Sequence, residues 1–249
     1  MIPIPNRYPD AVIECVFWLY YCQGLIYNSL KSYNKAVNSF NTAINYKNYG
    51  LLLAYNTQLF DEEIQMHQQL FASADKDANS KIASSNEVAA RSNTRNLLFK
   101  YQQLIECFSD QKNYPLSDWF NFMATFDMQL DNSTPKLQNS TKLGYTHYYK
   151  ALNLIALQKY REAITSLNKT IKLLPDFYPV YIEKAKIYIT QKKYQKVVQE
   201  YNKAIEIRPD EPQLYFDRSV ALFELGNTTK AKEDFAKWEK LSNNVNKKD

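Results

Sequence analysis

The sequence predicts an all-α protein made of antiparallel helix pairs that stack into a superhelix. Only four of its 249 residues are glycine, which argues against the Gly-rich turns of β-sandwiches and against phosphate-binding loops. Hydrophobic residues make up 45% of the chain, which is ample to bury a core. A pattern of Tyr, Ala and Pro recurs at a spacing of 34 residues, as is typical of a helical repeat.

The N-terminal part predicts a lead-in over residues 1–16 and a first helix pair over residues 17–50. Residues 11–27 are strongly apolar, but they include Glu14 and Gln23 and are fewer than a membrane span needs. The repeat pattern runs through this stretch, so burial inside a helix pair is the favoured interpretation. A membrane-tethered assembly factor anchored by residues 11–27 is the alternative.

The middle of the chain, residues 51–143, predicts degenerate helical repeats that start near Leu51 and Leu98. Two polar stretches, residues 72–86 and residues 131–141, are rich in Ser, Asn and Asp and predict surface loops inserted into these repeats. A bundle-like helical domain over this region is the alternative.

The C-terminal part predicts three consecutive repeats over residues 144–241, starting at Gly144, Tyr178 and Pro212. Helices approach closely only where small residues face each other, and a proline ends a helix. The polar tail, residues 242–249, is predicted to be disordered. The small residues predicted at the helix crossings are Ala151, Ala185 and Ser219 on the first helices and Ala163, Val197 and Ala231 on the second helices. The prolines predicted to end the second helices are Pro175 and Pro209.

This pattern resembles the tetratricopeptide repeat (TPR), because several positions agree in register across three consecutive units. The resemblance implies an α-solenoid that acts as a non-enzymatic scaffold or adaptor. In this family the first helix of each pair lines a concave groove, which would bind a peptide or an amphipathic helix of a partner protein. The implied groove residues are Tyr145, Tyr148, Leu152, Ile155, Ile182, Glu183, Lys186, Ile189, Phe216, Val220 and Phe223.

One family subtype binds the acidic C-terminal peptides of chaperones through a clamp of Lys, Asn and Arg. The matching places of this sequence hold Tyr148, Leu152, Glu183, Gln213 and Asp217. Two of these are carboxylates, which would repel a terminal carboxylate. We therefore expect that an acidic chaperone tail does not bind.

The sequence predicts no catalytic residue, no cofactor site and no metal site. It has only two histidines, His67 and His147, on different predicted units, and it has no GxGxxG, GKT or HExxH motif. The three cysteines form no CxxC pair, which favours a reducing compartment and hence the cytoplasm.

The formal net charge of +5 leaves nucleic acid as a possible partner. The lysines, however, fall mostly on predicted turns and second helices, where they are typical of a solvated surface. Protein binding is therefore favoured, and an RNA-binding or acidic-surface-binding helical repeat is the alternative.

Overall fold

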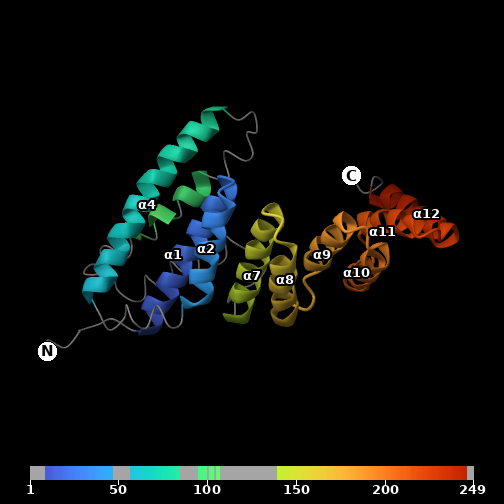
Figure 1. Ribbon diagram of the computed structural model, residues 1–249, viewed down its shortest axis with the longest axis horizontal. Coiled ribbons are helices and arrows are strands. Elements are labelled where there is room, and N and C mark those ends of the chain that lie inside the picture. The colour runs from blue at the N-terminus through green and yellow to red at the C-terminus, as the bar shows by residue number, and fades with distance from the viewer. Residues whose placement is uncertain are drawn as a thin grey trace. The chain divides into compact units, whose positions relative to one another are not determined.

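The computed structural model describes residues 9–46, 57–84, 95–99, 101–103, 105–106 and 139–245. Within these ranges the regular structure is α-helical and contains no strand, so the predicted all-α fold of stacked helix pairs is confirmed (Figure 1). The chain divides into two compact units, Met1–Leu157 and Gln158–Asp249, called unit one and unit two below.

Unit one contains α1 (Pro9–Ser29), α2 (Tyr33–Ile44), α4 (Thr57–Ser84) and α7 (Asn139–Ala156). Helices α1 and α2 form a hairpin, α7 packs against both of them, and α4 lies beside α1. The side chains of Phe17, Trp18 and Phe40 are almost completely buried at the centre. The apolar stretch around α1 thus supplies the core of this unit. None of the described helices combines the length and hydropathy that a membrane crossing requires.

The close approach of α1 and α2 depends on Gly24, at the eighth place of the first repeat. A Cβ atom there would lie 2.5 Å from a ring carbon of Phe40, which is fully buried. Ala36 and Ala43 of α2 are also fully buried. The small residues of the repeat are therefore at the helix crossing, as the sequence pattern indicates.

Three boundaries in unit one differ from those predicted. Helix α1 begins at Pro9, so half of the expected lead-in is helical. Helix α4 continues to Ser84, through most of the stretch expected to be a loop. That stretch contains alanine but neither Gly nor Pro, so nothing in it breaks a helix. Helix α7 begins at Asn139, inside the second expected loop over residues 131–141.

Helix α7 packs directly on α2, where stacking in chain order would place the repeat that starts near Leu51. Aromatic rings make this contact, since Phe40 of α2 stacks on Tyr149 of α7 at a centroid distance of 6.3 Å. Much of the stretch from 51 to 143 lies outside the described residues, and its division into degenerate repeats stays a prediction.

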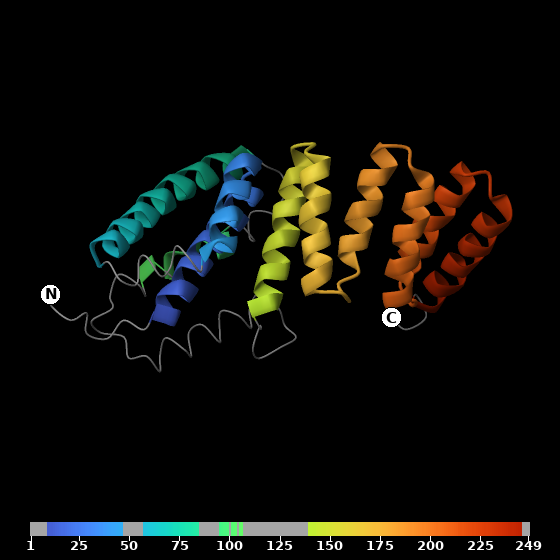
Figure 2. The same ribbon diagram turned by 60° about the horizontal axis from the view of Figure 1, so that its bottom comes forward.

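Unit two contains α8 (Tyr160–Leu173), α9 (Pro179–Thr190), α10 (Tyr194–Ile207), α11 (Pro212–Glu224) and α12 (Thr228–Val245). Each helix packs against the next one along the chain (Figure 2). Helices α9 and α10 form the pair predicted from Tyr178, and α11 and α12 form the pair predicted from Pro212. The helices of the pair predicted from Gly144 are α7 and α8, which belong to different units.

The ends of the helices in unit two follow the prolines. Helices α8 and α10 end just before Pro175 and Pro209. The carbonyl oxygen of each proline accepts a hydrogen bond from a tyrosine on the next helix, Tyr181 at 3.4 Å and Tyr215 at 3.0 Å. Helix α12 extends to Val245, so the first residues of the expected disordered tail are helical.

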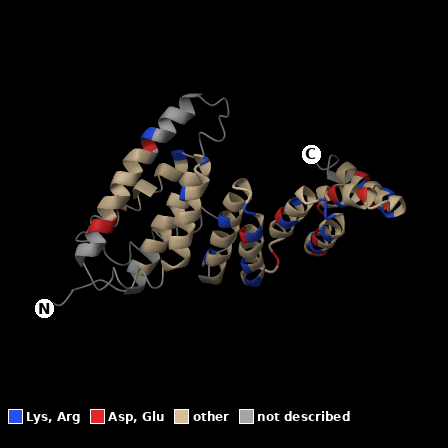
Figure 3. Ribbon diagram, viewed as in Figure 1, with Lys and Arg blue, Asp and Glu red and all other residues tan. Residues whose placement is uncertain are grey.

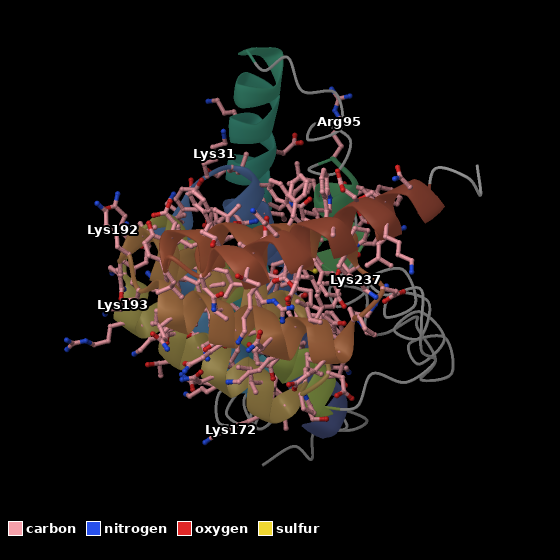
Figure 4. The ribbon with its side chains drawn as sticks, turned by 90° about the vertical axis from the view of Figure 1, so that its right-hand side faces the viewer. Lys31, Arg95, Lys172, Lys192, Lys193 and Lys237 are labelled. Carbon is pink, nitrogen blue, oxygen red and sulfur yellow. The ribbon has the colours of Figure 1, made fainter. Side chains whose placement is uncertain are left out.

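The turn inside each helix pair contains a residue in the left-handed backbone region, at the fifteenth place of the repeat. These residues are Lys31 (φ 56°), Gln158 (φ 59°), Lys192 (φ 53°) and Gly226 (φ 76°). In the turn after α9, the amide of Lys193 bonds to the carbonyl of Tyr188, which closes a Schellman motif. The Lys192 side chain projects from this turn away from the helices (Figure 4).

Candidate functional site

The predicted groove residues of unit two lie on the first helices, α9 and α11. On α11, Val220 and Phe223 are 49% and 65% exposed, and Phe216 on the same side is half-buried. These three residues are four and three positions apart, so they form one continuous apolar strip along the helix. Apolar side chains that are this exposed contribute little to the core of the unit, and a continuous patch of them is typical of an interaction site.

On α9, two isoleucines flank a pair of charges. Ile182 is half-buried and Ile189 is 42% exposed. Between them, the Nζ of Lys186 lies 2.7 Å from the Oε1 of Glu183, one helical turn away. The Lys186 side chain is 57% exposed and that of Glu183 is 14% exposed, so the pair lies at the edge of the surface and places both charge signs beside the apolar residues.

The predicted groove residues Tyr145, Tyr148, Leu152 and Ile155 are all half-buried on α7. The ring of Tyr148 lies against that of the next residue, with 5.7 Å between centroids. These four residues lie on one helix of unit one, whereas α9 and α11 belong to unit two. Their membership of a groove with the residues of α9 and α11 stays a prediction.

Two aromatic residues beside the α11 strip were not among the predicted site residues. Phe235 and Trp238 of α12 contact the ring of Phe216, with centroid distances of 6.4 Å and 5.2 Å. Phe235 is nevertheless 41% exposed. The sequence carries a signal for them: Trp238 stands at the twenty-seventh place, where Ala204 stands in the preceding repeat.

Three hairpins, α1–α2, α9–α10 and α11–α12, are each joined inside by a polar pair at the seventh and twenty-third places of the repeat. In unit two, Lys184 of α9 faces Glu200 of α10 at 3.0 Å, with each side chain only 8% exposed. Arg218 of α11 makes two hydrogen bonds to Asp234 of α12, at 2.6 Å and 2.7 Å. Such forked contacts fix the direction of both side chains.

In unit one the same two places hold neutral residues, and the hydroxyl of Ser39 donates to the amide oxygen of Gln23 at 2.8 Å. In unit two a further contact holds one hairpin to the next, because Arg218 also donates to Asn202 of α10 at 2.7 Å. Helix α11, which carries the exposed strip, is thus held in register with both α10 and α12.

Asp217, at a clamp place, is already engaged in hydrogen bonds. The Tyr201 hydroxyl donates to it at 3.2 Å and Gln213 donates to it at 2.8 Å. Burial raises the pKa of Tyr201, and the nearby Asp217 carboxylate raises it further. This carboxylate therefore serves the contact between α10 and α11.

The histidine of α4 lies in a buried polar network of unit one. His67 is fully buried, with its Nε2 3.3 Å from Glu63 and its Nδ1 hydrogen-bonded to the hydroxyl of Tyr101. Tyr20 of α1 donates to the same glutamate. The network joins α1, α4 and the helical residues near 101. Among the residues that the structure describes, no three His, Cys, Asp or Glu side chains are grouped as a metal site requires.

The repeated hairpins, their small crossing residues and their left-handed turns define a helical-repeat protein. Residues 185–226 match the family model described as "TPR repeat", and residues 19–49 match the one described as "Tetratricopeptide repeat". The chain thus contains stretches similar to TPR repeats in both of its units. The function that these matches support in general is that of a scaffold for protein–protein interaction.

Several solved structures are similar to the chain. A crystal structure of MamA is 17% identical, with 74% of this chain and 95% of that chain covered and a TM-score of 0.42. A complex of the TPR2AB domain of yeast Sti1 with pHSP90 is 15% identical, with coverage of 92% and 91% and a TM-score of 0.40. BtubC from P. vanneervenii is 11% identical, with coverage of 97% and 93% and a TM-score of 0.41. No curated protein matches the chain.

Proposed function

We propose that the protein is a non-enzymatic adaptor whose first-helix faces in unit two bind a peptide or an amphipathic helix of another protein. The observation that carries the proposal is the exposed strip of Phe216, Val220 and Phe223 on α11. Apolar residues spaced in this way fit the apolar side of a partner helix or alternate side chains of an extended peptide. Ile182 and Ile189 of α9 offer a second apolar patch of the same kind.

The charges near these residues favour an apolar partner segment over an acidic tail. Lys186 is paired with Glu183, and Asp217 accepts hydrogen bonds from its neighbours. A terminal carboxylate brought to this face would meet two carboxylates that already have partners. We therefore expect no measurable binding of an acidic chaperone tail by titration calorimetry.

A double variant, Val220→Ser with Phe223→Ser, tests the proposal. Val220 is 49% exposed and Phe223 is 65% exposed, so the double variant should fold normally. The amount of partner protein that it recovers should fall. Affinity purification followed by mass spectrometry compares it with the unaltered protein. Leu225→Ser is the matched control, because Leu225 is 42% exposed but lies at the end of α11, outside the strip.

The proposal is wrong if the double variant recovers the same proteins as the unaltered chain. A cooperative thermal unfolding transition, followed by circular dichroism, must be retained in both variants. A loss of that transition in the double variant would show that Val220 and Phe223 belong to the core instead.

RNA binding is the less favoured function. Figure 3 shows basic and acidic residues interspersed along α8 to α12, so the positive charge is not gathered into one strip on these helices. A salt-dependent shift of RNA mobility in a gel would favour this alternative over the peptide-binding face. The cytoplasmic location is part of our proposal, and the buried free thiol of Cys22 agrees with a reducing compartment.

A further inference from the structure

The outer face of α12 lacks the cover that the same face of α10 has. On α10, Tyr201 is 2% exposed and Ala204 is fully buried, because α11 packs over them. The residues at the same repeat places of α12 are Phe235, which is 41% exposed, and Trp238, which is half-buried. Among the described helices of unit two, α11 is the one that packs along α12.

Unit one shows the same face covered. Phe40 of α2 stands at the repeat place of Phe235 and is fully buried. Its ring contacts Tyr21 of its own hairpin and Tyr149 of α7, at 5.9 Å and 6.3 Å. In both units, therefore, a further helix covers the second helix of a pair at this place. The α12 face has the composition of a helix contact, but no described helix of unit two other than α11 packs on α12.

The charges beside Phe235 indicate what covers this face. Lys232 precedes Phe235 by three residues and Glu239 follows it by four, so all three lie on one side of α12. Both charged side chains are exposed, and neither has an ion-pair partner among the residues that the structure describes. One face thus carries a positive charge, an aromatic ring and a negative charge in order.

We propose that this face binds the same face of a second copy of the chain, with the two α12 helices antiparallel about a two-fold axis at Phe235. Reversal of one helix places Lys232 opposite the partner's Glu239, and symmetry repeats the contact on the other side. The two Phe235 rings meet between the two ion pairs. A parallel arrangement would instead bring each charge against its own copy. A two-fold interface requires a self-complementary patch of this kind.

This interface is centred on Lys232, Phe235 and Glu239 of α12, whereas the strip proposed to bind a partner lies on α11; the two surfaces adjoin where the Phe235 ring contacts Phe216. Dimerisation would leave each copy free to present its own α9 and α11. The two proposals can therefore fail independently, and the variants below do not alter Val220 or Phe223.

The test measures the mass of the full-length protein in solution by sedimentation velocity over a wide range of concentration. We expect the unaltered chain to dimerise as concentration rises. Lys232→Glu and Glu239→Lys should each weaken dimerisation by about tenfold or more, because like charges then meet twice. Lys240→Glu is the control, since it changes the charge equally on another side of α12 and should leave dimerisation unchanged.

Two further samples distinguish the antiparallel geometry from any other contact. The double variant Lys232→Glu with Glu239→Lys should dimerise again, because every contact joins opposite charges. An equimolar mixture of the two single variants should also dimerise, for the same reason. Phe235→Ser should abolish dimerisation while the far-ultraviolet circular dichroism spectrum is retained.

The proposal is overturned if the unaltered chain stays monomeric at every concentration. It is equally overturned if the single variants dimerise like the unaltered chain, or if the mixture of the two stays monomeric. A monomer whose α12 binds another protein would also contradict it, since the occupant would then not be a second copy.

Discussion

Replacing Glu200 with leucine should loosen the hairpin of α9 and α10, because it leaves the ammonium group of Lys184 buried without its carboxylate. The two side chains are each 8% exposed and their charged atoms lie 3.0 Å apart. Removing one partner of a buried pair costs about 3–5 kcal/mol. Since about 1.4 kcal/mol corresponds to a tenfold change in an equilibrium, amide protection in this hairpin should fall by roughly a hundredfold or more.

Two controls separate an unpaired charge from lost packing. The double variant Lys184→Met with Glu200→Leu removes both charges and should restore most of the protection, because apolar replacements of a buried pair are often neutral or stabilising. Lys186→Met breaks the surface pair with Glu183, which has the shorter distance of 2.7 Å. Because Lys186 is 57% exposed and Glu183 is 14% exposed, this pair is more solvated than that of Lys184 and Glu200, so the change should cost less than the loss of Glu200. Burial, rather than distance, decides the difference.

The assay is hydrogen exchange of the full chain, read by mass spectrometry on peptides from α9 and α10. This readout is local, so unit one does not contribute to it. The reasoning is refuted if the double variant is as weakly protected as Glu200→Leu, since packing alone would then account for the loss. It is refuted as well if Lys186→Met lowers protection as much as the buried change does.

Three further outcomes can be measured by urea unfolding. Lys192→Gly should stabilise the chain by about 0.5–1 kcal/mol, since only glycine adopts the left-handed turn without a steric cost; no gain in the urea midpoint would contradict this. Gly24→Ala should destabilise it by about 1–3 kcal/mol despite the higher helix propensity of alanine, because the Phe40 ring must move; an unchanged midpoint would show that it moves freely. The raised pKa of Tyr201 means that the folded state retains the phenol proton, so its stabilising effect is complete below about pH 10 and declines above it. Tyr201→Phe should make that alkaline decline shallower, and an identical decline would assign it to other groups.

The parts of the fold that depend on side-chain size can be predicted from the sequence. A helix crossing requires a small residue, and Ala151 and Ala185, which stand at the predicted eighth places, are fully buried. Gly24 stands at the eighth place of the first pair and lies next to the Phe40 ring, a neighbour that the pattern did not indicate. The prolines after α8 and α10 likewise end these helices where the pattern indicates. Steric requirements of this kind restrict which residue types can stand at a position, so they can be recognised in the sequence.

The parts of the fold that depend on backbone conformation or on long-range pairing are harder to predict from the sequence. Lys31 and Lys192 adopt the left-handed backbone conformation. A glycine at these positions would have indicated such a turn in the sequence, but a lysine does not. Helix α4 crosses a polar stretch whose composition also fits a loop. The exposure of the α11 strip could be predicted from its repeat places, but the contact of Phe216 with Phe235 and Trp238 depends on what lies beyond α12.

The polar pairs inside the hairpins have a consequence for how a repetitive chain avoids folding onto the wrong neighbour. Similar helices can exchange partners, yet the first hairpin joins Gln23 to Ser39 whereas α9 carries Lys184. If α9 folded against α2, that ammonium group would be buried opposite a neutral hydroxyl group, with no carboxylate to compensate it. The polar pairs of the two units are therefore not interchangeable, and a hairpin that combined α9 with α2 would be less stable than either native hairpin.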